Sequence, residues 1–253
     1  GGLLPDDAKV YTPYGATECL PVTCFTGREV LDETAARTRL GEGYCVGRPV
    51  PGVQVRVIRL SDGPVPRWSQ VTPLATGEIG EIVVQGPVVS RRYFGLPEQT
   101  ARHKIYESDD ESAGPFWHRI GDLGYLDAQG RLWFCGRQAH RVVTGSQTYY
   151  TVCVEAIFNT HPTVARSALV GLGANRYQQT PVIIIEPKPG MMPRTAAERA
   201  TRRAELVKLA DQHHLTHGLH EIRFHPAFPV DIRHNAKIFR EKLARWADTG
   251  AGR

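Results

Sequence analysis

The pattern of apolar residues changes near residue 136, and this change limits the folds open to the chain. Before it, short apolar runs alternate with polar residues, as at Val53, Val55 and Val57, which is the pattern of half-buried strands. After it, strand-like runs alternate with helical segments such as the amphipathic stretch Ala196–Asp211. A chain of 253 residues can form one large domain or two ordinary ones. We therefore predict an α+β protein with a strand-rich part, 1–136, followed by a small α+β domain, 137–253.

Turn and cap signals within each part predict its individual elements. In the first part we expect a surface excursion with helical turns at 26–43, a tight turn at Gly121-Asp122 and a hairpin loop at 127–130. Strands are expected there at 81–84 and 131–134. In the second part we expect helices at 152–159, 196–211 and 237–247, and strands at 168–172, 181–185 and 221–225.

Charge and cysteine usage exclude several classes of protein. The net charge of +5 comes from 31 basic and 26 acidic residues that are interspersed, so we expect no nucleic-acid partner. The longest apolar runs, such as 182–185, are too short for a transmembrane segment, and no signal peptide is visible. The five cysteines have no CxxC spacing, which argues against a zinc or disulfide framework and favours a cytoplasmic protein.

The stretch Tyr14-Gly15-Ala16-Thr17-Glu18 combines an aromatic ring, a glycine, a hydroxyl and a carboxylate. The glycine allows backbone and ring to approach a planar ligand closely. Thr17 can donate to a phosphate oxygen, and Glu18 offers a hard oxygen ligand for Mg²⁺. The alternative interpretation is an ordinary turn in which Glu18 is simply solvated.

Three further residues along the chain have side chains that could bind a sugar or a phosphate. Asp122 lies in Gly121-Asp122 and could accept hydrogen bonds from two ribose hydroxyls. Arg137 stands where the sequence pattern changes and could act as a forked donor to ribose or phosphate. Lys237 lies in a polar segment before the last helix. Taken singly, they could equally be a turn aspartate, a surface arginine and an exposed lysine.

In this order, the four signals resemble the adenylate-forming superfamily of acyl-CoA and aryl-CoA synthetases, luciferases and nonribosomal-peptide adenylation domains. The segments at 46–53, 76–82 and 92–100 also look like the middle section of that family. The resemblance implies that 1–136 is the C-terminal portion of the large AMP-binding domain, with a distorted β-barrel. It also implies that 137–253 is the mobile small C-terminal domain.

The resemblance assigns a role to each residue of the opening motif. Tyr14 and Gly15 would contact adenine, with the ring of Tyr14 stacked on it. Thr17 would contact the α-phosphate of ATP, and Glu18 would hold Mg²⁺.

The same resemblance assigns the later residues to the sugar and to the chemistry. Asp122 would bind the ribose hydroxyls with help from Arg137. Lys237 would be the catalytic residue, bridging the substrate carboxylate and the α-phosphate. A cation placed there stabilises charge that develops in the transition state.

Departures from the family pattern indicate the product. Ile120 replaces the usual Thr or Ser, and the hinge reads Gln138-Ala139-His140 without the usual acidic residues or lysine. The segment 233–237, Arg-His-Asn-Ala-Lys, resembles the olefin β-lactone synthetases of bacterial long-chain hydrocarbon biosynthesis. That resemblance implies adenylation of a 2-alkyl-3-hydroxy fatty acid and intramolecular closure to a β-lactone, with release of AMP and pyrophosphate. It also implies complexes with other enzymes of that pathway.

Two alternatives remain open from the sequence. One is a fatty-acyl-CoA or acyl-AMP ligase, and the other is a non-catalytic scaffold module. In the family, the pyrophosphate loop and most of the acyl pocket precede the Tyr14 motif, so we expect the 253-residue chain alone to be inactive. The histidines at 213, 214, 217 and 220 lack the HExxH pattern, and we expect them to form an exposed polar face rather than a metal site.

Overall fold

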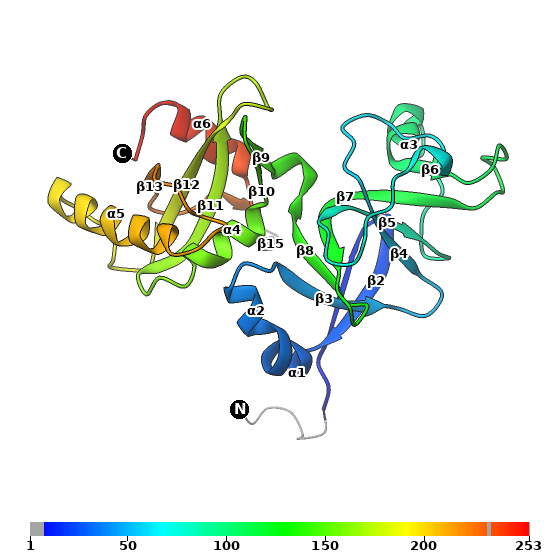
Figure 1. Cartoon of the computed structure of the whole chain (residues 1–253), viewed down its shortest axis with the longest axis horizontal. Helices are drawn as coiled ribbons and strands as arrows, with labels where there is room; N and C mark the ends of the chain where they lie inside the picture. The colour runs from blue at the N-terminus through cyan, green and yellow to red at the C-terminus, as the bar shows by residue number, and fades with distance from the viewer. Residues whose placement is uncertain (1–7, 232–233, 253) are drawn as a thin grey trace. The chain divides into compact units, whose positions relative to one another are not determined.

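The structure is a computed structural model that describes residues 8–231 and 234–252 (Figure 1). It divides into two compact units. The first contains the residues up to Ala36 together with Gly43–Gln138, and the second contains Arg37–Glu42 and the residues from Ala139 onward.

The first unit is built on one antiparallel sheet. Its strand order is β1-β2-β3-β8-β7-β5-β4, and the short β6 also pairs with β7. The strands are β1 (Tyr11–Ala16), β2 (Cys19–Thr26), β3 (Tyr44–Pro49), β4 (Gln54–Ile58), β5 (Gly80–Gln85), β6 (Lys104–Tyr106), β7 (Phe116–Leu126) and β8 (Leu132–Arg137). Among the described residues no ladder joins β4 back to β1, so the strand-rich expectation is confirmed but a closed barrel is not observed.

The apolar alternation read from the sequence places the core of this sheet. Val55 and Val57 of β4 are buried while Gln54 and Arg56 are exposed. Residues of β2, β5 and β8, including Val22, Ile82 and Leu132, pack with Val55 in one apolar cluster. The sheet is therefore held by side chains that alternate toward a common core.

Short helices fill the connections. The excursion predicted at 26–43 contains α1 (Gly27–Glu29), the π-helical turn η1 (Val30–Thr34) and α2 (Ala35–Arg39). Thr26 caps its start, because its side chain and that of Glu29 form a capping box. The other helical segments are η2 (Trp68–Gln70), α3 (Pro97–His103) and η3 (Gln138–His140).

The second unit has a three-stranded sheet in the order β11-β12-β13. β11 (Val164–Leu172) is antiparallel to β12 (Thr180–Pro187), and β12 is parallel to β13 (Ile222–Phe224). The connection between the parallel strands contains α5 (Ala196–Asp211), whose bounds are those predicted. Thr195 caps this helix through a second capping box.

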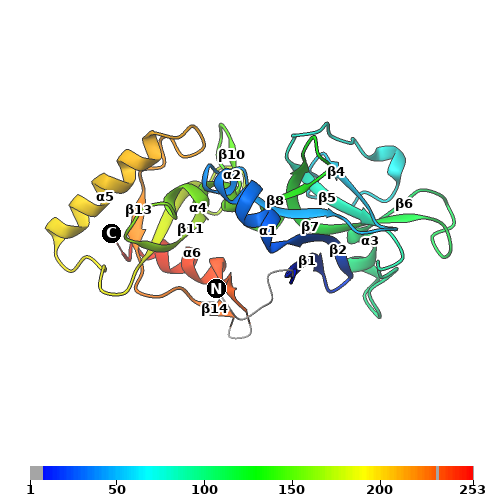
Figure 2. The same cartoon turned by 90° about the horizontal axis from the view of Figure 1, so that it is seen from below.

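Helices cover both faces of that sheet (Figure 2). Leu169, Ile183 and Ile222 pack with residues of α4 (Thr151–Phe158) and α5. The alternate residues Val170 and Ile184 pack with α6 (Arg240–Asp248) on the other face. Two small hairpins, β9 (Val142–Val143) with β10 (Thr148–Tyr149) and β14 (Val230–Asp231) with β15 (His234–Ile238), complete the unit.

Two local predictions were wrong. The expected turn at Gly121-Asp122 lies inside β7, where the pairing with β5 shifts register between Glu81 and Val83. Gly121 adopts a φ of +80° in this irregular stretch, so the strand bends without ending. The expected polar loop around Lys237 is strand β15, and the last helix begins at Arg240.

Arg233, which also belonged to the predicted family segment, lies outside the described residues. In the part of the chain that the structure describes, no helix has the length and apolar character needed to cross a membrane.

Candidate functional site

Tyr14 lies near the end of β1, where the pairing with β2 is irregular between Tyr14 and Ala16. Gly15 makes this geometry accessible, because a Cβ there would lie 2.3 Å from the carbonyl oxygen of Cys19. The hydroxyl of Tyr14 donates to Asp122 Oδ2 at 2.6 Å. Burial, together with the charge of Asp122, raises the pKa of Tyr14, so the phenol remains a hydrogen-bond donor.

Asp122 and Arg137 face each other on adjacent strands. They are register partners on β7 and β8, and Arg137 Nε donates to Asp122 Oδ1 at 3.0 Å. The Asp122 side chain is 8% exposed and that of Arg137 is 50% exposed. Each carboxylate oxygen thus accepts one hydrogen bond from the protein and retains capacity for another, while the guanidinium remains half open to solvent.

Glu18 is held at two points in the β1–β2 turn. Its Oε1 accepts a hydrogen bond from the Tyr93 hydroxyl at 3.0 Å, and its backbone carbonyl accepts one from the Ser90 N–H at 2.8 Å. Burial acts to raise the pKa of Glu18, but hydrogen bonds from its own backbone N–H and from Tyr93 outweigh it, so the pKa falls. Glu18 is therefore ionised at neutral pH.

The residues around Glu18 fit one common mode of Mg²⁺ binding. No group of three or more His, Cys, Asp or Glu side chains that could hold a metal ion occurs among the described residues. Mg²⁺ commonly takes one or two carboxylates and completes its shell with water and substrate phosphates. A single ionised carboxylate at a turn suits that mode.

The structure brings most of the predicted residues into one unit. Tyr14, Asp122 and Arg137 form a connected group, while the exposed Thr17 and the half-buried Glu18 occupy the adjoining turn. Lys237 belongs to the second unit. Its side chain is 60% exposed, with Nζ 3.8 Å from Asp231 Oδ2.

Sequence reasoning missed the support of Glu18. Tyr93 lies 75 positions from Glu18 in the chain, and the only sequence feature of the segment 92–100 is its family resemblance. Behind it lies the buried amine of Lys104, 3.1 Å from His118 Nδ1. Burial lowers the pKa of Lys104 to about 8 and that of His118 to about 4. The one sequence signal was a lysine on an otherwise apolar strand.

Comparison with known proteins places these residues in context. Residues 2–94 match the family model described as AMP-binding enzyme. The chain is 49% identical to an olefin beta-lactone synthetase of Xanthomonas campestris over 97% of its length, and 50% identical to one of Stenotrophomonas maltophilia over the same share. It spans 43% of the length of each of these relatives.

More distant similarity extends to CoA ligases and to solved structures. A 2-succinylbenzoate–CoA ligase of Geobacillus kaustophilus is 31% identical over 79% of this chain, which covers 35% of that ligase. The amide bond synthetase McbA of Marinactinospora thermotolerans aligns with a TM-score of 0.67 at 24% identity, over 93% of this chain and 42% of that one. ATP-bound MatB of Rhodopseudomonas palustris gives 0.68 at 22% identity, over 94% and 41%. At such identities the structural likeness shows the fold alone.

Proposed function

The chain belongs to the AMP-binding, adenylate-forming superfamily, and on that premise we propose that the full-length protein makes a β-lactone. Its substrates are ATP and a 2-alkyl-3-hydroxy fatty acid. The observation that carries the proposal is the 49–50% identity to two olefin beta-lactone synthetases across 97% of this chain. The activity is assigned to the full-length protein, since the chain spans 43% of those relatives.

The proposed reaction has two steps. In the first, a carboxylate oxygen of the fatty acid attacks the α-phosphorus of ATP, and pyrophosphate leaves. In the second, the 3-hydroxyl oxygen attacks the activated carbonyl, loses its proton, and AMP leaves as the four-membered ring closes. Because nucleophile and electrophile share one molecule, an effective molarity on the order of 10⁵ M or more is available for the closure.

The connected group of Tyr14, Asp122 and Arg137 supports a nucleoside site. Asp122 is fixed by the Tyr14 hydroxyl on one oxygen and by Arg137 on the other, so its remaining lone pairs can accept the ribose hydroxyls. The same contact with Asp122 fixes the ring of Tyr14, which would stack on adenine. Arg137 would add a donor to the ribose or to a phosphate.

Two further residues would serve the triphosphate. Glu18 would hold Mg²⁺, which neutralises phosphate charge when bound, and Thr17 would donate to the α-phosphate. Lys237, with its exposed ammonium, would contact the carboxylate and the α-phosphate as charge develops there.

A CoA ligase is the nearest alternative, and the 31% identity to 2-succinylbenzoate–CoA ligase favours it. A thioester requires a site for an external thiol, whereas closure to the lactone needs no external acyl acceptor. The hinge sequence Gln138-Ala139-His140 lacks the usual charged residues of CoA ligases. Gln138 instead donates its side-chain amide to the Ser61 carbonyl at 2.9 Å. These features support the lactone over the thioester.

ATP–pyrophosphate exchange by the full-length protein tests the adenylation step. We expect exchange that depends on a 2-alkyl-3-hydroxy fatty acid. The matched 2-alkyl acid without the hydroxyl should also support exchange but should give no cyclised product. Absence of exchange with both acids would reject adenylation and favour a non-catalytic scaffold. A measurement of ATP binding by the full-length protein would then test the scaffold, which should bind no nucleotide.

A further inference from the structure

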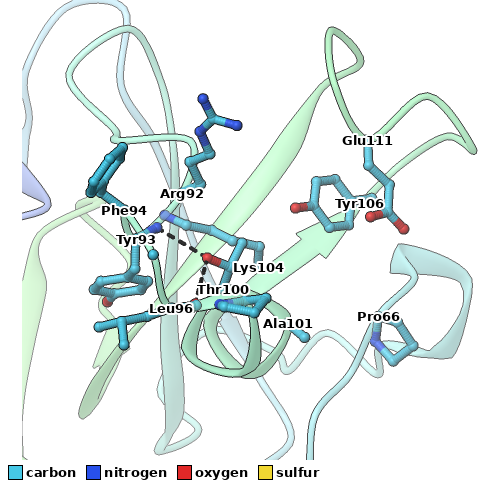
Figure 3. Close-up of a pocket in the computed structure, with 12 residues that line it drawn as sticks. Pro66, Arg92, Tyr93, Phe94, Leu96, Thr100, Ala101, Lys104, Tyr106 and Glu111 are labelled. Carbon is cyan, nitrogen blue, oxygen red and sulfur yellow. Dashed lines mark hydrogen bonds between the residues drawn. The ribbon is translucent and has the colours of Figure 1, made fainter.

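The segment that carries Tyr93 borders a hollow of about 460 Å³ (Figure 3). The hollow is lined by residues 92–97, by side chains of α3 and β6, and by Pro66 and Glu111. Phe94 in this segment is 96% exposed and Leu96 is 54% exposed. Apolar packing therefore does little to fix Phe94 and Leu96. Tyr93 is half-buried, with its ring centroid 5.8 Å from that of His103 and 6.4 Å from that of His118, and polar contacts also hold it.

Two of these contacts involve Thr100 of α3. Its hydroxyl accepts a hydrogen bond from the Tyr93 N–H at 3.0 Å and donates to the Leu96 carbonyl at 3.1 Å, as the dashed lines in Figure 3 show. Thr100 thereby ties the loop to the first turns of the helix that follows it. This contact fixes the backbone of Tyr93 but not its ring.

Lys104 also holds the segment that carries Tyr93, from the buried side. Its side chain is fully buried, and Nζ donates to the Ser90 carbonyl at 2.5 Å. The N–H of Ser90 donates to the backbone carbonyl of Glu18 at 2.8 Å, so one residue links the lysine to the turn that bears Glu18. The ammonium also lies 5.7 Å from the centroid of the Tyr93 ring, an arrangement that favours the ring in this position.

The Tyr93 hydroxyl then reaches Glu18 Oε1. The hydrogen bond occupies one carboxylate oxygen and restricts rotation of the side chain. Backbone and carboxylate of Glu18 are thus both fixed by one segment, residues 90–93, which Lys104 and Thr100 hold in place. Burying the charge of a lysine is costly. Packing alone therefore does not account for Lys104 at this position.

We propose that Tyr93 and Lys104 are positioning residues that hold the Glu18 carboxylate in the orientation in which it binds Mg²⁺. The inference rests on the proposed function, since it assumes that Glu18 is the Mg²⁺ ligand. Neither residue touches the reacting atoms. Their effect is on the Mg²⁺ requirement of the first half-reaction.

A Mg²⁺ titration of ATP–pyrophosphate exchange by the full-length protein tests this. Tyr93→Phe keeps the ring and removes the donor, and we expect it to raise the half-saturating Mg²⁺ concentration about tenfold, as for a lost hydrogen bond to a charged group. The rate at saturating Mg²⁺ should stay within about twofold of wild type. Lys104→Met should shift the Mg²⁺ requirement in the same direction.

Two reference variants make the result interpretable. Arg92→Ala truncates an exposed side chain on the same loop and should leave the Mg²⁺ requirement unchanged. Glu18→Gln removes the proposed ligand and should shift it more than Tyr93→Phe does. Thermal melting by circular dichroism identifies any variant that fails to fold, and Tyr93→Phe keeps the test available if Lys104→Met is such a variant.

The possible results distinguish failure of the positioning role from failure of the proposed function. If Glu18→Gln shifts the Mg²⁺ requirement and Tyr93→Phe does not, the positioning role is wrong and the proposed function stands. A rate loss in Tyr93→Phe that is equal at every Mg²⁺ concentration also rejects positioning. If Glu18→Gln itself causes no shift, or wild type shows no exchange, the assignment of Glu18 fails and this inference fails with it.

Discussion

Replacing Lys104 by methionine should change how the stability of the first unit depends on pH. Lys104 is a fully buried side chain on β6, and burial lowers its pKa from 10.5 to about 8. Methionine has a similar length and no charge. The wild-type protein therefore carries a titrating group in its core that the variant lacks.

The sign follows from proton binding in the two states. Below pH 8 the folded and unfolded forms both hold the proton, and the folded form bears the full cost of a buried charge. Between about pH 8 and pH 10.5 the unfolded lysine still holds the proton while the folded one has lost it, so rising pH favours folding. Each pH unit in that window contributes up to about 1.4 kcal/mol. After allowing for partial solvation, we expect about 2 kcal/mol between pH 7 and pH 10.

Three neighbours of Lys104 have shifted pKa values that keep them in one protonation state between pH 7 and pH 10. Burial and the charge of Lys104 lower the pKa of His118 to about 4, so the imidazole is neutral throughout. Burial and the Glu18 carboxylate raise the pKa of Tyr93, and the lowered pKa of Glu18 keeps it ionised. The other groups that act on Lys104 are Cys19 and Arg91, and burial raises the pKa of the Cys19 thiol.

Urea unfolding of wild type and Lys104→Met at pH 7 and pH 10 measures the effect. Tryptophan fluorescence suits the purpose, because Trp68, Trp117 and Trp133, three of the four tryptophans, lie in the first unit. The wild-type free energy of unfolding minus that of the variant should rise by about 2 kcal/mol from pH 7 to pH 10. Taking this difference cancels the lost contact with Ser90. A difference that stays constant within about 0.5 kcal/mol would refute the reasoning, since Lys104 would then titrate as a solvated amine.

Three further predictions concern the proposed nucleotide and catalytic residues. Asp122→Asn should weaken ATP binding by the full-length protein about 10- to 100-fold, because an amide cannot accept on both sides; isothermal titration checks this, and unchanged affinity would remove Asp122 from the site. Gly15→Ala should destabilise the first unit by about 1–3 kcal/mol, because the new Cβ would meet the Cys19 carbonyl at 2.3 Å; an unchanged urea midpoint would contradict the close approach. Lys237→Ala should lower the adenylation rate of the full-length protein about 100-fold, and exchange near the wild-type rate would exclude the proposed catalytic role.

Local periodicity predicted the regular elements well. The amphipathic pattern predicts the helix Ala196–Asp211 with its observed bounds, because that pattern lies within one short window. The Val53, Val55 and Val57 alternation identified β4 for the same reason. Such patterns depend only on residues that are close in sequence, so they can be recognised without knowledge of the tertiary structure.

The errors occurred where strand pairing decides the local conformation. Gly121-Asp122 has the composition of a turn, but pairing with β5 on one side and β8 on the other keeps it within β7. The segment before the last helix looked like a loop because it is polar, yet β14 pairs with it. Ladder hydrogen bonds override local propensity in both cases, from distant strands at Gly121-Asp122 and from the adjacent strand of a hairpin at Lys237.

In the candidate site, too, the residues could be proposed from the sequence but their contacts could not. The identities of Tyr14, Asp122 and Arg137 could be proposed from their order along the chain. The hydrogen bonds that connect them span separations of 108 and 15 residues, so only the fold could show that they meet. Tyr93 and Lys104 act through contacts of the same long-range kind, and no local pattern marks either residue as a support for Glu18.

Product analysis of the full-length protein is the most direct test of the central claim. The protein would be incubated with ATP, Mg²⁺ and a 2-alkyl-3-hydroxy fatty acid, with and without CoA, and the lipid products identified by mass spectrometry and NMR. We predict a β-lactone and AMP in equal amounts, whether or not CoA is present. A CoA thioester as the main product, or a hydroxy acid recovered unchanged without AMP formation, would contradict the account.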